Sequence, residues 1–139
     1  MKKKLSVLLA VLLFPMSVLA KRNDAPDLAF RTDHYYATYL INKDGSDVET
    51  FDSANTVLEK RGLSMLKQKT ISYSASMESV KVLSAYTRKA DGHRITVPKT
   101  NFQLNINSGK AKQPPAFSDI DTLTVVFPDV EVGDTVVLS

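Results

Sequence analysis

The sequence predicts an all-β protein, an antiparallel β-sandwich that is incomplete or open at its C-terminal edge and follows an N-terminal signal peptide. Three observations predict this fold class. Apolar and polar residues alternate with a period of two, β-branched and aromatic runs recur at short intervals, and turns that contain Gly separate them. The chain also lacks the regularly spaced helical segments that connect parallel strands, which favours antiparallel pairing.

The N-terminus has the three parts of a Sec signal peptide. The lysines Lys2 to Lys4 precede an apolar run from Leu5 to Phe14, and small residues lead to Ala20. We expect cleavage between Ala20 and Lys21. Since a spanning helix needs roughly 20 apolar residues, no stable membrane insertion is expected after cleavage. The pattern predicts a periplasmic protein, with secretion as the alternative.

The predicted organisation is a signal peptide at residues 1–20, a flexible segment at residues 21–33 and the β-sandwich domain at residues 34–139. The chain has 18 Lys and Arg against 15 Asp and Glu, and the leader holds three of the basic residues and no acid, so the mature part is balanced. This balance argues against nucleic acid as a partner. The chain contains no Cys, which excludes a disulfide, a thiolate metal site and a Cys nucleophile.

Individual strands follow from the alternation. Tyr35–Ile41 and Val48–Phe51 flank the turn Asn42–Gly45 and predict a hairpin, and the turn Ala90–Gly92 predicts a second one. Further strands are expected at Thr70–Tyr73, Val80–Thr87, Arg94–Val97, Leu123–Phe127 and Thr135–Leu138. A helical turn fits only Val57–Leu66, where Gly62 interrupts it. The segment Lys99–Ser118 is expected to be a long loop with one short strand around Phe102–Ile106.

The histidines and acids give weak functional signals. His34 and His93 have no companion at metal-ligand spacing, so we expect surface residues rather than ligands or a general base. Asp44, Asp91 and Asp134 each adjoin a Gly, which favours local hydrogen bonds in turns over a calcium site. No metal and no cofactor are therefore predicted.

The hydroxyl-bearing residues are also more typical of structure than of chemistry. Neither a G-x-S-x-G nor an S-x-x-K motif surrounds the serines of the segment SYSASMES, residues 72–79, which is expected to be a strand end and turn. Five tyrosines fill the core or form cross-strand pairs, which we favour, or else line a sugar- or peptide-binding face: Tyr35, Tyr36, Tyr39, Tyr73 and Tyr86.

Three segments carry a family resemblance: SYSASMES at 72–79, AYTRKADG at 85–92 and VFPDVEVGD at 126–134. With them, the chain resembles the exported bacterial domain of unknown function that precedes transglutaminase-like domains. The resemblance implies a β-sandwich in an envelope context that continues into further strands and a papain-like domain. The Cys, His and Asp of that catalytic domain have no counterpart in this chain, so the resemblance implies no activity.

The resemblance also implies that this chain corresponds to the first part of a longer module. We therefore predict an open edge and a candidate interaction surface at Thr135, Val136, Val137 and Leu138. The loop Lys99–Ser118 is a second candidate surface. The apolar run Thr122–Phe127 is predicted to be the segment most prone to self-association through an edge strand.

The favoured functional hypothesis is a non-enzymatic periplasmic module that binds or positions a protein or glycan of the envelope. The alternative is an accessory subunit whose sandwich is completed by a strand from a partner or a second copy. A hydrolase using Ser, His and Asp is a remote alternative, because the residue types are present without a recognisable spacing.

Overall fold

The structure of the protein is a computed structural model that describes residues 27–106 and 119–139. The predicted signal peptide, with its cleavage site at Ala20 and Lys21, lies outside the described residues. So does the part of the predicted Lys99–Ser118 loop that spans residues 107–118. Within the described ranges, no helix has the length and apolarity needed to cross a membrane.

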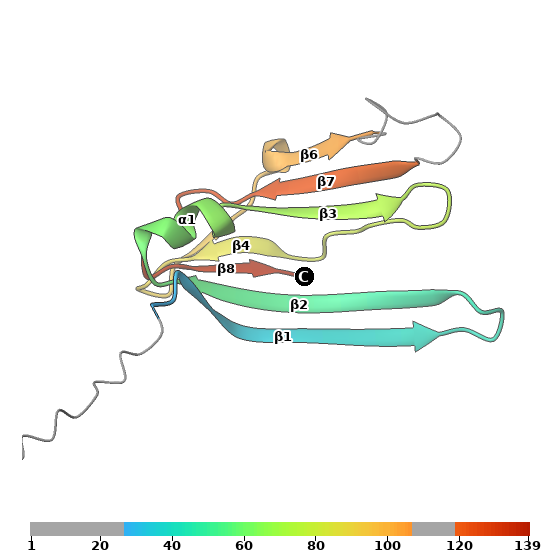
Figure 1. Ribbon diagram of the computed structural model, residues 1–139, viewed down its shortest axis with the longest axis horizontal. Coiled ribbons are helices and arrows are strands. Elements are labelled where there is room, and N and C mark those ends of the chain that lie inside the picture. Colours follow the sequence, from blue (N-terminus) through green and yellow to red (C-terminus); the bar gives the residue numbers. More distant parts are fainter. Residues whose placement is uncertain (1–26, 107–118) are drawn as a thin grey trace, which may run out of the picture.

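Two antiparallel sheets form the predicted β-sandwich (Figure 1). The five-stranded sheet has the order β1-β2-β8-β4-β5. Its strands are β1 (Phe30–Ile41), β2 (Asp47–Val57), β8 (Thr135–Leu138), β4 (Ala85–Arg88) and β5 (Arg94–Thr96). The three-stranded sheet has the order β3-β7-β6. Its strands are β3 (Gln68–Ser74), β7 (Ile120–Val126) and β6 (Phe102–Asn105), and the helical elements are α1 (Lys60–Leu66) and the 3₁₀ turn Lys99–Asn101.

Both predicted hairpins are confirmed, and each depends on a Gly with positive φ. Gly45 in the β1–β2 turn has φ of 86°, and Gly92 in the β4–β5 turn has φ of 91°. In each turn an Asp side chain accepts a backbone N–H two residues ahead: Asp44 from Ser46 at 3.0 Å, and Asp91 from His93 at 2.9 Å. The expected turn chemistry of these acids is therefore confirmed.

The core lies between the two sheets. Val57 and Val125 are fully buried and come from β2 and β7, and Val136 and Leu138 of β8 join them. Each fully buried Val or Leu stabilises the fold by roughly 1.5–3 kcal/mol. Because strands from both sheets contribute to one cluster, each sheet buries its apolar face against the other sheet.

The predicted interaction edge at Thr135–Leu138 is wrong. β8 lies in the middle of its sheet, where it pairs with β2 on one side and β4 on the other. Its residues Thr135, Val136, Val137 and Leu138 are all buried. The physical reason lies in its composition. The run from Val136 to Leu138 is apolar at successive positions, so it has apolar side chains on both faces, as is typical of a strand that is covered on both faces. The sheet is therefore not open at β8.

Two further expectations about the strands are corrected. The β-sandwich domain was predicted to start at residue 34, but β1 already begins at Phe30. Phe30 belongs to the domain because its side chain packs against the core. The segment Thr122–Phe127 is not an edge strand available for self-association, since β7 pairs with β3 on one side and with β6 on the other. The predicted strand Val80–Thr87 is confirmed only from Ala85 onward.

Helix α1 forms within the expected segment, but Gly62 does not interrupt it. Gly62 is buried inside the helix, and a Cβ placed on it would lie 2.2 Å from the carbonyl oxygen of Ala29. That same oxygen accepts the backbone N–H groups of Leu58 and Glu59 at 3.1 and 3.2 Å. The absence of a side chain at Gly62 thus lets the chain before β1 dock against the start of α1.

Replacing Gly62 with Ala is expected to lower the free energy of unfolding by about 1–3 kcal/mol, because the new methyl group displaces backbone rather than a flexible side chain. Urea unfolding followed by circular dichroism measures this change. Ser64→Ala on the exposed side of α1 is the matched control and is expected to change stability by no more than about 0.5 kcal/mol. Equal stability of Gly62→Ala and the wild type would contradict the close approach.

Candidate functional site

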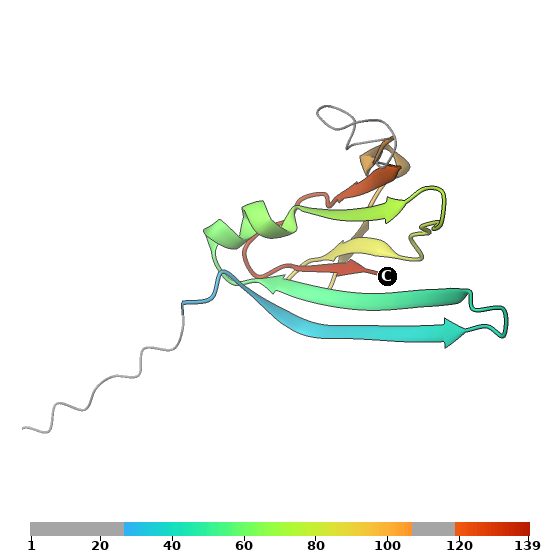
Figure 2. The ribbon, with the colours of Figure 1, turned by 45° about the vertical axis from the view of Figure 1, so that its right-hand side comes forward.

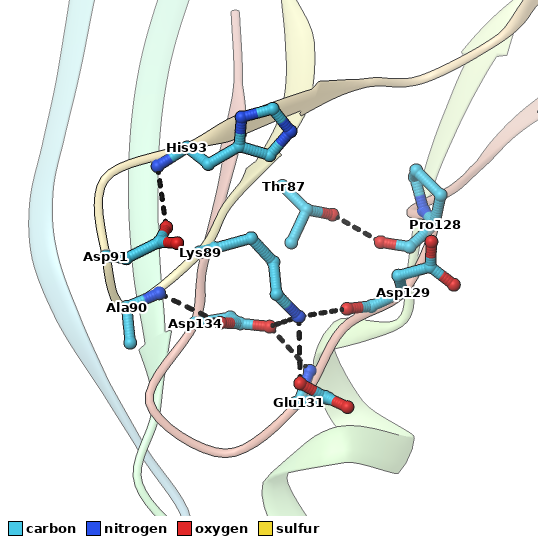
Figure 3. Close-up of polar contacts among 9 residues, drawn as sticks. All are labelled: Thr87, Lys89, Ala90, Asp91, His93, Pro128, Asp129, Glu131 and Asp134. Carbon is cyan, nitrogen blue, oxygen red and sulfur yellow. Dashed lines mark hydrogen bonds and ion pairs between the residues drawn. The ribbon is translucent and has the colours of Figure 1, made fainter.

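An ion pair between the half-buried Lys89 and the buried Asp134 joins two of the three segments that carry the family resemblance (Figure 3). The ammonium of Lys89, just after β4, donates to the carboxylate of Asp134 at 2.6 Å and to that of Glu131 at 3.0 Å. It also donates to the backbone carbonyl of Asp129 at 2.8 Å. The side chain of Asp134 is 2% exposed and accepts the backbone N–H groups of Ala90 and Glu131 at 3.1 and 2.8 Å.

The electrostatics of this cluster suit a structural role. The hydrogen bond from Lys89 to Asp134, and then the one to Glu131, raise the pKa of the Lys89 ammonium above its ordinary value. A protonated Lys has no lone pair and so is not a nucleophile or a general base at neutral pH. Nearby, the buried hydroxyl of Thr87 donates to the carbonyl of Pro128 at 2.7 Å. We therefore infer that these contacts of Lys89 and Asp134, called the Lys89 cluster below, hold the loop before β8 against the β4–β5 turn.

The third resemblance segment forms a second hydrogen-bonded cluster at the end of β3. The hydroxyl of Ser74 donates to the carboxylate of Asp119 at 2.7 Å, and the hydroxyl and N–H of Ser76 donate to the same oxygen. Glu78 accepts the backbone N–H of Ser74 at 2.7 Å. The hydrogen bonds from Ser76, and then from Ser74, lower the pKa of Asp119 to about 2. The expectation of a polar strand end and turn in this segment is confirmed.

The structure places His34 apart from these clusters, whereas His93 lies beside the Lys89 cluster, where its backbone carbonyl accepts the N–H of Lys89 at 2.7 Å (Figure 3). His34 lies in β1, with its Nε2 atom 3.5 Å from a carboxylate oxygen of Asp52 and its ring stacked on Tyr36. His93 lies in the β4–β5 turn, where its backbone N–H binds Asp91. In the part of the chain that the structure describes, no three side chains of the types His, Cys, Asp and Glu gather at a metal-binding distance.

Several elements together build an open cleft between the two sheets. Its volume is about 360 Å³, and it lies between the β1–β2 hairpin and β3. Its lining mixes apolar and polar side chains: Thr32, Tyr35, Phe51, Ser53, Asn55, Lys69, Thr70, Ile71 and Leu138. The sheet that contains β3 has three strands and the facing sheet has five, so the smaller sheet covers only part of the larger one.

Exposed aromatic residues continue from this cleft along the hairpin. Tyr35, Tyr36 and Tyr39 are all exposed, whereas Tyr73 and Tyr86 are half-buried. The expectation of buried tyrosines is therefore wrong for the three on β1. The cross-strand pairs that were expected with it are confirmed, since the ring of Tyr35 stacks on that of Phe51 in β2 and the hydroxyl of Tyr39 donates to Glu49 in β2. Sequence reasoning missed the cleft because its lining comes from β1, β2, β3 and β8, and no local pattern reveals which strands face each other.

Substitution of Asp134 by Asn is expected to lower the free energy of unfolding by about 1–3 kcal/mol, because it replaces a buried carboxylate whose oxygens accept the Lys89 ammonium and the backbone N–H groups of Ala90 and Glu131. Thermal and urea unfolding measure the loss. Asp129→Asn is the matched control, since Asp129 is exposed, has φ of 48° and contributes its backbone carbonyl to the cluster. A stability of Asp134→Asn equal to that of the control would show that the ion pair does not hold the loop.

The stability that Asp119 contributes is expected to depend on acid pH. The folded-state pKa of about 2 lies below the ordinary value of 3.8, so the contribution is present above about pH 4 and is lost as the pH falls toward 2. The difference in Tm between the wild type and Asp119→Asn should therefore be constant from pH 7 to pH 5 and disappear near pH 2. The same scan on Asp47→Asn, an exposed carboxylate on β2, is the control. A Tm difference that does not change with pH would overturn the role of Asp119.

The comparisons with known proteins confirm the resemblance. The family model described as "Domain of Unknown Function with solved-structure structure (DUF3857)" matches residues 43–139, whereas no curated protein matches the sequence. A crystal structure from Parabacteroides distasonis ATCC 8503, described as that of a "putative protease", has a TM-score of 0.71 at 22% identity over 79% of this chain. This chain spans 22% of that solved chain, and the likeness supports the fold alone. Because the family model covers well over half of the sequence, the protein belongs to the DUF3857 family.

Proposed function

We propose that the protein is a non-enzymatic module of the bacterial envelope that binds or positions a protein or glycan. The observation that carries this proposal is the open cleft beside the exposed tyrosines of β1. Aromatic side chains exposed next to a concave surface offer large contact area at low cost in conformational entropy, and they suit both peptide and sugar ligands.

The assignment as a module without catalysis rests on how the distinctive residues are used. Lys89 and Asp134 bind each other, and the hydroxyl groups of Ser74 and Ser76 bind Asp119 rather than a His. A Ser, His and Asp hydrolase, the remote alternative, needs its Ser hydroxyl bonded to the His that acts as its base. These polar side chains, from the segments that carry the resemblance, thus hold turns in place.

The proposed location is the periplasm. The leader with its lysines, apolar run and small residues before Ala20 supports export by the Sec route. An envelope location also fits the absence of Cys, because a protein without thiols is indifferent to an oxidising compartment. Nucleic acid is not among the proposed partners, since the mature part has no excess of basic residues.

Site-specific photo-crosslinking in intact cells tests the proposal. A photoreactive amino acid in place of Tyr39 is expected to yield discrete cross-linked products in the periplasmic fraction, because Tyr39 lies on the hairpin beside the cleft. The matched control carries the same group in place of Met65, which is also exposed but lies on α1 at the far end of the sandwich (Figure 2).

Two results would contradict the proposal. Retention of the chain in the cytoplasm with Met1 still attached would remove the envelope role. Identical products from the Tyr39 and Met65 positions would show that contacts at the hairpin are non-specific.

A further inference from the structure

A row of side chains crosses all five strands of the larger sheet at the start of β8. Thr135 pairs with Thr56 of β2 on one side and with Arg88 of β4 on the other. Arg31 of β1 lies opposite Thr56, and Arg94 of β5 lies opposite Arg88. Because residues directly opposite each other in a sheet share a face, three arginines and two threonines lie side by side on one face.

This row faces away from the smaller sheet. Val136 of β8 packs in the core between the sheets, and successive side chains of a strand point to opposite faces. Thr135 and the rest of the row therefore lie on the outer face of the larger sheet, whereas the cleft lies on its inner face. A ligand of the row would thus be distinct from the ligand of the cleft that is proposed above.

A chain of hydrogen bonds along the row holds Arg88 in place. The hydroxyl of Thr56 donates to the Asp33 carboxylate at 2.6 Å, so its single hydrogen is used there. The hydroxyl of Thr135 lies 2.8 Å from that of Thr56 and must then donate to it. The Nη2 atom of Arg88 in turn donates to the Thr135 hydroxyl at 3.4 Å. Since Thr56 and Thr135 are buried, this chain orders Arg88 from beneath and leaves the rest of its guanidinium at the surface.

The carboxylate of Asp33 is shared unequally between two of the arginines. It accepts the Nε–H of Arg31 at 2.7 Å, whereas the Nη2 atom of Arg88 lies 4.0 Å away. The hydrogen bond from Thr56, and then that from Arg31, lower the pKa of Asp33, so the carboxyl is ionised at neutral pH. Its negative charge mainly offsets that of Arg31, and the positive charges of Arg88 and Arg94 remain.

Arg88 and Arg94 are like charges held directly opposite each other. The N–H of Val97 donates to the carbonyl of Ala85 at 3.0 Å, so the odd-numbered residues of β4 are the ones that bond to β5. Arg88 and Arg94 therefore form a non-hydrogen-bonded pair, in which the side chains lie closest and the Cα atoms are about 4.5 Å apart. By itself, such a pair of like charges is destabilising.

The exposed Arg94 is held by an aromatic ring rather than by a carboxylate. Within residues 27–106 and 119–139 it forms no ion pair, and its Cζ atom lies 4.8 Å from the centroid of the Tyr86 ring. A cation–π contact of this kind fixes the charge over the ring and uses none of the five N–H donors of the guanidinium. Two guanidinium groups are thus anchored side by side, one by Thr135 and one by Tyr86, with N–H groups available to a ligand.

We propose that Arg88 and Arg94 together bind a phosphate monoester or inorganic phosphate, so that the ligand is either the phosphate group of a sugar or the free ion. Such a group carries about −1.5 to −2 charges at neutral pH, which matches two guanidinium groups, and each guanidinium can donate two N–H groups to its oxygens. A carboxylate carries one charge and leaves one arginine without compensation. A shared dianion also offsets the repulsion between the two arginines, which gives the binding a driving force that the pair alone lacks.

Titrations of the purified chain, labelled with ¹⁵N, test this site. The probes are inorganic phosphate and glucose 6-phosphate, and acetate at equal ionic strength is the control with a single charge, since salt screens exposed charges. Both phosphates are expected to shift the side-chain Nε–H resonances of Arg88 and Arg94 to saturation and to bind at least about tenfold more tightly than acetate. Tighter binding of glucose 6-phosphate assigns the group to a sugar, and tighter binding of inorganic phosphate assigns it to the free ion.

Substitutions supply the second arm of the test. Arg88→Gln and Arg94→Gln are each expected to weaken phosphate binding at least about tenfold, because each removes a charge-assisted pair of hydrogen bonds. Lys81→Gln removes the same charge from an exposed position before β4 and is expected to bind phosphate as the wild type does. Arg94→Lys keeps the charge without the planar fork and is also expected to bind more weakly. Arg94 lies outside the hydrogen-bond chain of Thr135, so its variants keep the test valid even where Arg88→Gln does not fold.

Three results would overturn the proposal. They are shifts that grow with concentration without saturation, phosphate binding by Arg94→Gln equal to that of Lys81→Gln, and wild-type affinity of Arg94→Lys, which would show attraction by charge alone. None of them depends on photo-crosslinking at the hairpin, because the two arginines and the cleft lie on opposite faces of the sheet. Failure of one proposal therefore leaves the other standing.

Discussion

The carboxylate of Asp134 lies where the two halves of the five-stranded sheet meet. Its oxygens bind the ammonium of Lys89 and the N–H of Ala90 from the β4–β5 hairpin, while its backbone carbonyl accepts the N–H of Val57 from β2. Asp134 directly precedes β8, the strand that pairs with both β2 and β4. One buried residue thereby positions the strand that joins two hairpins into one sheet, and the core residues Val136 and Leu138 follow from that placement.

The same architecture leaves one region without cover. The sheet of β3, β7 and β6 has three strands, whereas the facing sheet has five. The apolar cluster forms where the sheets overlap, and β1 and β2 extend beyond the end of β8 with exposed side chains on their outer half. The larger size of one sheet thus leaves both the cleft and the aromatic surface beside it. The proposed binding function therefore follows from the different sizes of the two sheets rather than from a motif.

The distinctive sequence motifs and the candidate binding surface occupy different places in the molecule. AYTRKADG and VFPDVEVGD meet in the Lys89 and Asp134 cluster, and SYSASMES closes onto Asp119. Each motif supplies hydrogen-bond partners for polar groups in loops or in the interior. Without these partners the polar groups would be unpaired, which would lower the stability of the fold. The binding surface depends instead on ordinary strand residues such as Tyr35, Tyr39 and Phe51, whose types alone do not distinguish them from core residues.

The amino-acid sequence by itself determined the elements whose cause is local. The period of two and the turn residues Gly45 and Gly92 were enough to predict both hairpins, because a positive φ is a property of one residue. The order of the strands was decided by tertiary structure alone. Ser53 and Leu138 are 85 residues apart, and alternation says that each lies in a strand without saying which strand is its neighbour. For that reason β8, predicted as an edge, is central, and the tyrosines of β1, predicted to be buried or paired across strands, are paired across strands but exposed.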